Sequence, residues 1–265
     1  YWESLNYNGK LVVVKSTDGP LATTITNDRT DNLVTFNHGE NSFAVLDGFK
    51  LREGWIGVVC IGSGPTISHN LFVDQHIDNW SAIALCGATD YAVEPDGDIR
   101  YFPSAGPAPA VIINNTIIGC ANGGISTFST IPPVIKNNII AHNGHYGIHK
   151  EGIQPGVAPP DLSYNDVFGN PENYQEITYA GEGTISADPL FNPDLTLSES
   201  SPCIDAGDPN PMYNDADGSR ADMGAIGSNA GGGGGDIVIP TNEWINVYCA
   251  NPIMNGGPLA PGTVI

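Results

Sequence analysis

Acidic and aromatic side chains gather in one stretch of the sequence, residues 74–102, where their types could act on a carbohydrate. Glycan hydrolysis needs two carboxylates at a fixed separation, and aromatic rings can stack on sugar rings. The acids of this stretch do not repeat on one strand face, so we name no catalytic residue. We take six residues as candidate carbohydrate contacts: Trp80, Tyr91, Asp96, Asp98, Arg100 and Tyr101.

A second stretch, NDADGSRAD at residues 214–222, resembles a cation-binding loop. Asp215 and Asp217 alternate before Gly218, and Asp222 follows five residues after Asp217. Ca²⁺ takes six to eight oxygen ligands from loops of this kind. The segment lacks a third alternating acid and a terminal Glu, so a turn that caps its own backbone is the competing interpretation. Asp215, Asp217 and Asp222 are our candidate calcium ligands, and the self-capping turn is the alternative.

Ligands for softer metals are sparse. His142, His145 and His149 lie close together in the sequence, but no third ligand for a pair of them is evident. The five cysteines have no CxxC or CxxH spacing, which argues against a metal–thiolate site. We interpret the histidines as exposed or turn-lining side chains and the central cysteines as buried free thiols.

The charge balance restricts the partners. The 265 residues carry a formal net charge of −20, with nine basic side chains against 29 acidic ones. Nucleic acids and anionic membrane surfaces are bound through clustered Lys and Arg, so both partner classes are excluded, and we expect no membrane insertion. A polyanionic substrate would be repelled unless calcium bridged it. Neutral glycans, cations and protein surfaces remain as partners.

An internal repeat organises the chain. Four segments share an apolar pair, a turn residue and a second apolar pair, and a fifth fits more loosely: Ala44–Leu51, Thr66–Val73, Val111–Gly119, Val134–Asn143 and Asp161–Asn170. The turn positions are Gly48, Asn70, Asn115, Asn138 and Asn165, separated by 22, 45, 23 and 27 residues. The long interval contains an insertion at residues 87–109. A Gly-apolar step follows three of these turns by about ten residues, at Gly57, Gly124 and Gly147.

A repeat of this length made only of short strands predicts a parallel solenoid with little helix. A single coil cannot bury its own apolar side chains, but coils stacked about 4.8 Å apart form a continuous core. Asparagine tolerates a left-handed turn, and its amide can bond to the next coil. We therefore predict a structural ladder of Asn70, Asn115, Asn138 and Asn165.

The repeat and the later segments resemble the right-handed parallel β-helix superfamily, of which pectate lyases are the best-known members. The similarity is closest to its secreted bacterial and archaeal repeat proteins of unassigned function. It rests on five segments: NGKLVVVKSTDGPLATTI (Asn8–Ile25), NSFAVLDGFKL (Asn41–Leu51), ISADPLFNPD (Ile185–Asp194), SPCIDAGDP (Ser201–Pro209) and DADGSRADMGAIG (Asp215–Gly227). The resemblance implies a right-handed β-helix and an extracellular or cell-surface location, and it implies little about activity.

We predict three regions. An all-β solenoid spans residues 1–228, with regular coils from about Leu11 to Phe168 and a closing segment at 185–228. A Gly-rich linker follows at 229–235, and residues 236–265 begin a β-sandwich-like module or supply an exchanged strand. A neighbouring copy that completed both ends would give a head-to-tail filament.

Three functions fit these observations. The first is a non-catalytic module of a surface protein or filament that serves adhesion, spacing or self-assembly with itself or other surface proteins. The second is a carbohydrate-active enzyme, a lyase or hydrolase, with its site near residues 87–109. The third, a copper-associated β-helix protein, is suggested only by the fold and the histidines. We expect no cofactor apart from calcium.

Overall fold

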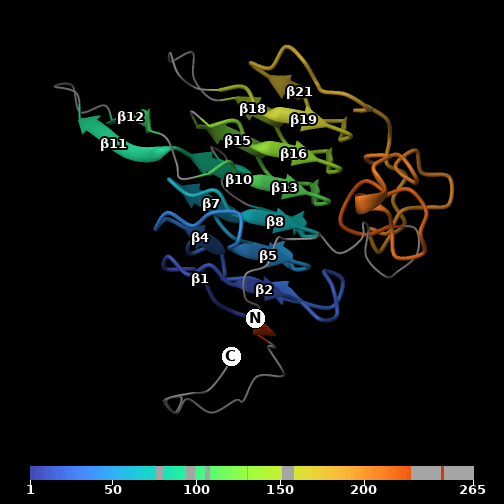
Figure 1. Ribbon diagram of the computed structural model, residues 1–265, viewed down its shortest axis with the longest axis horizontal. Helices are drawn as coiled ribbons and strands as arrows, with labels where there is room; N and C mark the ends of the chain where they lie inside the picture. Colours follow the sequence, from blue (N-terminus) through green and yellow to red (C-terminus); the bar gives the residue numbers. More distant parts are fainter. Residues whose placement is uncertain are drawn as a thin grey trace.

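The computed structural model describes residues 1–75, 80–93, 99–104, 108–129, 131–150, 158–227 and 246–247. These residues form three parallel sheets that stack as the coils of a right-handed β-helix (Figure 1). The only helix in the described part of the chain is the short 3₁₀ turn Pro211–Tyr213. None of these residues forms a helix long and apolar enough to cross a membrane. The predicted all-β solenoid is confirmed.

The first sheet contains, in spatial order, β1 (Leu5–Asn6), β4 (Val34–Phe36), β7 (Val58–Ile61), β10 (Ser81–Cys86), β15 (Gly123–Phe128), β18 (Tyr146–Lys150) and β21 (Glu172–Gln175). The second contains β19 (Asp161–Ser163), β16 (Val134–Lys136), β13 (Val111–Ile113), β8 (Thr66–Ser68), β5 (Val45–Asp47), β2 (Val13–Lys15) and β22 (Asn246–Val247). The third contains β20 (Asp166–Phe168), β17 (Ile139–Ala141), β14 (Thr116–Ile118), β9 (Leu71–Val73), β6 (Lys50–Arg52) and β3 (Thr24–Ile25). A separate hairpin pairs β11 (Ala88–Val93) with β12 (Ile99–Ser104).

The register confirms both sequence landmarks. In the second sheet Ile112 pairs in parallel with Ile135, one coil further along. In the first sheet Ile125 pairs with Ile148, so the Gly-apolar steps of successive coils lie side by side. Strands begin at residue 5 and continue to residue 175, so the coils extend beyond the predicted limits at both ends.

At least one apolar side chain from each strand of the central coils points into the solenoid. Stacking turns these side chains into a continuous core, and each fully buried one contributes about 1.5–3 kcal/mol. The inward side chains of the central coils are Leu46, Ile67, Ile112, Ile135 and Leu162 from the second sheet, Leu51, Phe72, Ile117, Ile140 and Val167 from the third, and Val58, Ile83, Ile125 and Ile148 from the first.

The predicted asparagine ladder joins the second sheet to the third. The backbone N–H of Asn70 donates to Oδ1 of Asn115 at 2.9 Å, and that of Asn115 donates to Oδ1 of Asn138 at 2.9 Å. Asn138 continues the series to Asn165 at 3.0 Å. All four residues are fully buried. The ladder therefore fixes the spacing of four successive coils at one turn.

The left-handed backbone conformation belongs to the residue before each ladder asparagine, which corrects our prediction. Asn114 has a φ of 53° and His69 a φ of 51°. Gly48, with a φ of 80°, aligns with His69 rather than with Asn70, and Phe49 occupies the ladder position of that coil. In this two-residue turn the first residue has the left-handed conformation that bends the chain from the second sheet to the third, and the second directs its amide along the stack.

A second ladder, which the sequence analysis did not identify, joins the third sheet to the first. The N–H of Cys120 donates to Oδ1 of Asn143 at 3.1 Å, and that of Asn143 donates to Oδ1 of Asn170 at 2.9 Å. Gln75 fills the same role earlier, accepting from the N–H of Gly54 at 3.1 Å. Two of the three turns of a coil are therefore closed by side-chain amides.

The closing segment lies beside the third sheet, where Figure 1 shows it in orange. Met223 is fully buried against the outward side chain of Ile139, and Ala225 packs against Leu71, so the middle of the third sheet is covered on both faces. Lys136 Nζ lies 2.6 Å from a carboxylate oxygen of Asp208 and ties the segment to the second sheet. Strands buried on both faces read as continuous apolar runs, as in the repeats TII and IIA.

Two predicted regions fall mostly outside the described residues. The linker at 229–235 lies wholly outside them, and of residues 236–265 only Asn246–Val247 are described, as β22. This strand pairs in parallel with β2 of the same chain. The division of the chain into a solenoid, a linker and a further module stays a prediction.

Candidate functional site

The insertion at residues 87–109 contains the hairpin of β11 and β12. Figure 1 shows this hairpin extending sideways from the stacked coils. Tyr91 is paired directly with Tyr101 across the hairpin. The structure therefore brings together two of the aromatic residues that the sequence analysis selected as carbohydrate contacts.

The other candidate contacts have different outcomes. Arg100 lies on β12, next to Tyr101, and pairs with Ala92. Trp80 immediately precedes β10 and is 38% exposed. Asp96 and Asp98 lie outside the described residues, so their roles stay predictions.

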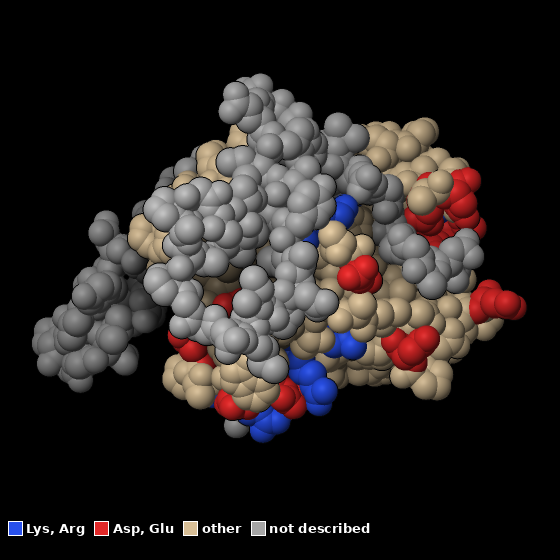
Figure 2. Space-filling model, turned by 90° about the horizontal axis from the view of Figure 1, so that it is seen from below, with Lys and Arg blue, Asp and Glu red and all other residues tan. Residues whose placement is uncertain are grey.

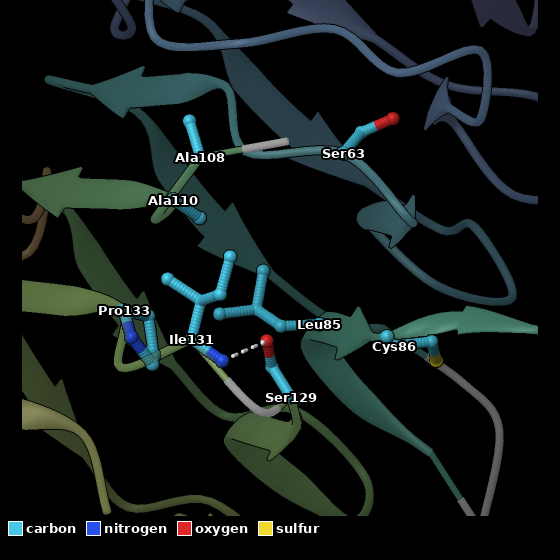
Figure 3. Close-up of a pocket in the computed structure, with 9 residues that line it drawn as sticks. Ser63, Leu85, Cys86, Ala108, Ala110, Ser129, Ile131 and Pro133 are labelled. Carbon is cyan, nitrogen blue, oxygen red and sulfur yellow. Dashed lines mark hydrogen bonds between the residues drawn. The ribbon is translucent and has the colours of Figure 1, made fainter. Parts of the chain in front are cut away.

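A pocket lies where the insertion leaves and rejoins the coils (Figure 3). Its cavity volume is about 10 Å³, which is room for about one water molecule. The N–H of Ile131 donates to Oγ of Ser129 at 3.2 Å on one side of it. The described residues that line it include no carboxylate, imidazole or basic side chain: Ser63, Leu85, Cys86, Gly87, Ala108, Ala110, Ser129, Ile131 and Pro133.

The acidic loop of residues 214–222 directs its carboxylates at backbone amides. Asp215 Oδ2 accepts from the N–H of Asp222 at 3.1 Å, and Asp222 Oδ1 accepts from the N–H of Asp205 at 2.8 Å. Asp217 Oδ1 accepts from the N–H of Ser219 at 2.9 Å. Within the described residues no group of three or more His, Cys, Asp or Glu side chains is arranged to hold a metal ion. The calcium site stays a prediction.

The clustered histidines contact aromatic rings. His142 meets the ring of Phe168 edge-on, with 5.6 Å between the ring centroids. His145 and His149 lie on either side of the buried Tyr146, at 5.5 Å and 4.9 Å from its ring. Burial lowers the pKa of His149, although Glu side chains nearby oppose the shift. His142 and His145 are exposed and lie outside the strands, as predicted, whereas His149 is half-buried on β18.

A charged cluster on the second sheet was missed by the sequence analysis. Asp47 is only 7% exposed, and its Oδ1 accepts from His69 Nδ1 at 2.7 Å and from Ser68 Oγ at 2.8 Å. Lys15 Nζ lies 3.1 Å from Asp47 Oδ2. A carboxylate can only accept, so His69 carries a proton on Nδ1. An aspartate holds the imidazole in this way in hydrolytic triads.

The residues of this cluster come from three successive coils, which is why the sequence did not reveal it. Lys15, Asp47 and Ser68 occupy matching register positions on three successive coils. They are separated by 32 and 21 residues in the sequence, and only stacking brings them together. The buried His69 Nε2 has no hydrogen-bond partner in the described structure.

The Asp47 carboxyl has a strongly perturbed pKa. Burial alone would raise this pKa, but the hydrogen bond and charge of His69, together with Lys15 and Ser68, lower it to about 2. Because this is below the ordinary value of 3.8, ionised Asp47 stabilises the fold at any pH above about 4. That contribution is lost as the pH falls through about 2.

We predict that Asp47→Asn lowers the free energy of unfolding by about 2 kcal/mol at pH 7. The fall of the Asp47 pKa from 3.8 to about 2 corresponds to a stabilisation of the charged carboxylate of about that size. The variant should also lose less stability than the unaltered chain between about pH 4 and pH 2. Urea unfolding at several pH values measures both effects. Asp18→Asn, an exposed position near the same coil turn, is the control and should change little. Equal pH dependence of the two variants would contradict the prediction.

A second buried carboxyl lies between the third sheet and the closing segment. Asp166 is fully buried, and Cys203 Sγ donates to its Oδ2 at 3.2 Å. The N–H of Ala187 donates to Oδ1 at 3.1 Å. Burial raises the pKa of Asp166 to about 6, so part of the molecules carry it protonated near neutral pH. Its contacts belong to the packing of the closing segment.

Comparison with known proteins adds no relative. No protein-family model, curated protein or solved structure matches this chain. The architecture supports the β-helix part of the resemblance described above, because three parallel sheets stack coil upon coil. The narrower assignment to a secreted, pectate-lyase-like branch stays a prediction.

Proposed function

We propose that the chain is a non-catalytic extracellular module of a surface protein or filament, serving adhesion, spacing or self-assembly. The observation that carries this proposal is a hairpin that extends from the side of a rigid stack of coils. Two amide ladders fix the coil spacing, and the β11–β12 hairpin extends from that stack with Tyr91 paired to Tyr101 (Figure 1). A stiff solenoid can hold the segments at its two ends a fixed distance apart, and the projecting hairpin offers a surface for contact with a partner.

The surface charge supports uncharged or cationic partners. The few basic side chains on the N-terminal coils lie beside acidic ones, with Arg52 3.2 Å from Glu53 and 3.5 Å from Asp74. Figure 2, which looks at this end, shows blue side chains next to red ones and further red ones elsewhere. The chain as a whole has a formal net charge of −20. Neutral glycans or other surface proteins are the proposed partners, with calcium as a proposed bridge to anionic ones.

The alternative is a carbohydrate-active enzyme with its site at the insertion. The observation that favours it is the pairing of Tyr91 with Tyr101 on the insertion. The pocket at the base of the hairpin, at about 10 Å³, has room for about one water molecule rather than a sugar ring. A lyase or hydrolase would need carboxylates or a base from the insertion itself, where Asp96, Asp98 and Arg100 are the candidates.

We predict that the double variant Tyr91→Ala/Tyr101→Ala weakens binding to neutral polysaccharide or to a surface partner at least about tenfold, because each ring contributes about 0.5–1.5 kcal/mol in a stacked contact. Binding is measured on a panel of immobilised neutral glycans and on intact cell surfaces, with the unaltered chain as reference. Glycan products released by the unaltered chain would favour the enzyme instead.

Tyr179→Ala is the matched control, since Tyr179 is 72% exposed and lies after the last coil rather than on the hairpin. It should leave binding unchanged. Equal losses in the control and in the double variant would contradict a role for the hairpin.

A further inference from the structure

The last strand of the second sheet comes from the far end of the chain. In β22, Asn246 pairs with Val13 and Val247 with Val14, in parallel. Figure 1 shows this short red strand beside the N-terminal coil. The β2 strand therefore has neighbours on both sides, β5 on one and β22 on the other.

The backbone hydrogen bonds of β2 show which groups β22 covers. Val12 accepts through its carbonyl from the N–H of Val45 at 3.0 Å, and the N–H of Ser16 donates to the carbonyl of Asp47 at 2.9 Å. Backbone groups of alternate residues point to opposite sides of a strand in a parallel sheet. The amides of Val13 and Lys15 therefore point away from β5, toward β22.

Without β22 this edge would be an exposed template for pairing. A row of unpaired N–H and C=O groups readily adds a strand from another chain. Apolar side chains add to the hazard, because Leu11 is 50% exposed and Phe43 is 42% exposed, each two residues before a strand of this sheet. Covering such an edge keeps a solenoid from associating through its end.

We propose that the chain's own Asn246–Val247 strand guards the β2 edge and prevents it from pairing with a second copy. The occupant is intramolecular, as the register with Val13 and Val14 shows. The inference rests on the self-assembly role proposed above, because displacement of β22 would release the edge for association.

The test uses the full chain with Asn246→Pro/Val247→Pro, since proline cannot donate to a sheet ladder. Amide hydrogen exchange at Val13 and Lys15 should become at least about tenfold faster, because these amides lose their partner strand. Exchange at Val14 and Ser16, which face β5, should stay the same and serves as an internal reference. Sedimentation at micromolar concentrations should show a monomer for the unaltered chain and concentration-dependent association for the variant.

The matched control is Met254→Pro/Asn255→Pro, which adds two prolines to the same segment outside β22. It should match the unaltered chain in both measurements. A synthetic peptide of residues 242–250 added to the Asn246→Pro/Val247→Pro variant should restore protection of Val13 and Lys15 and reduce association.

Three results would overturn the proposal. The first is equal exchange of Val13 and Lys15 in the unaltered chain and the proline variant. The second is a variant that stays monomeric while its edge is exposed. The third is protection of the Val13 and Lys15 amides of the unaltered chain only at concentrations where copies associate, because the edge would then be covered by a second copy. If the proline variant changed glycan binding but neither amide exchange nor sedimentation, the result would bear on the proposed adhesion role and not on the edge of β2.

Discussion

Asn138→Ala is expected to lower the free energy of unfolding by about 3 kcal/mol, because several buried partners lose their hydrogen bonds at once. The two N–H groups of Asn138 Nδ2 are shared among three acceptors, the carbonyl of Ile112 at 2.9 Å, that of Lys136 at 2.8 Å and Oδ1 of Asn165 at 3.0 Å. Its Oδ1 accepts from the backbone and side chain of Asn115 at 2.9 Å and 3.1 Å.

Equilibrium unfolding in urea measures the loss. Asn37→Ala is the control, because Asn37 is exposed and bonds only to exposed side chains, including His38. It should change the free energy of unfolding by less than about 0.5 kcal/mol. If Asn138→Ala were as mild as the control, the ladder would be a consequence of stacking rather than a cause of its stability.

Gly124→Val is expected to be comparably destabilising, by about 3 kcal/mol, although valine is among the best strand formers. A Cβ at Gly124 would lie 2.5 Å from Cγ2 of Ile140 and 2.6 Å from the carbonyl oxygen of Gly147 in the next coil. One obstacle is a core side chain and the other is backbone, so relief requires the coils to separate.

Thr35→Val on β4 of the same sheet is the matched control. Thr35 is half-buried and already has a β-branched side chain, so the change only replaces a hydroxyl by a methyl group and should be tolerated within about 0.5 kcal/mol. Thermal and urea unfolding compare the two variants. A Gly124→Val variant as stable as the unaltered chain would mean that strand propensity, not space, sets this position.

The sequence alone determined the repeating part of the fold. The Asn and Gly landmarks recur at nearly constant spacing, and stacked coils are the arrangement that places equivalent residues side by side. This is why the pairing of Ile112 with Ile135 and the Asn115–Asn138 contact could be predicted. The second ladder had a signal too, since Asn143 and Asn170 repeat the 27-residue interval of Asn138 and Asn165.

The candidate functional residues were predictable only in part. Tyr91 and Tyr101 could be selected from their types and their place in an insertion, but their direct pairing depends on a hairpin register that the insertion's sequence did not reveal. The left-handed position was misplaced by one residue, since a two-residue turn written Asn-Asn has the same composition in either order. Asn114 and Asn115 show this ambiguity, because only the backbone separates their roles.

The tertiary structure alone decided which side chains meet between distant parts of the chain. Asp47 and His69 belong to the repeat segments Ala44–Leu51 and Thr66–Val73, but their hydrogen bond depends on how one coil is placed on the next. The closing segment has no repeat, so its packing of Met223 against Ile139 depends on the shape and apolar outer face of the third sheet. The pairing of Val247 with Val14 likewise follows from the free edge of a finished sheet, which exists only after the coils have stacked.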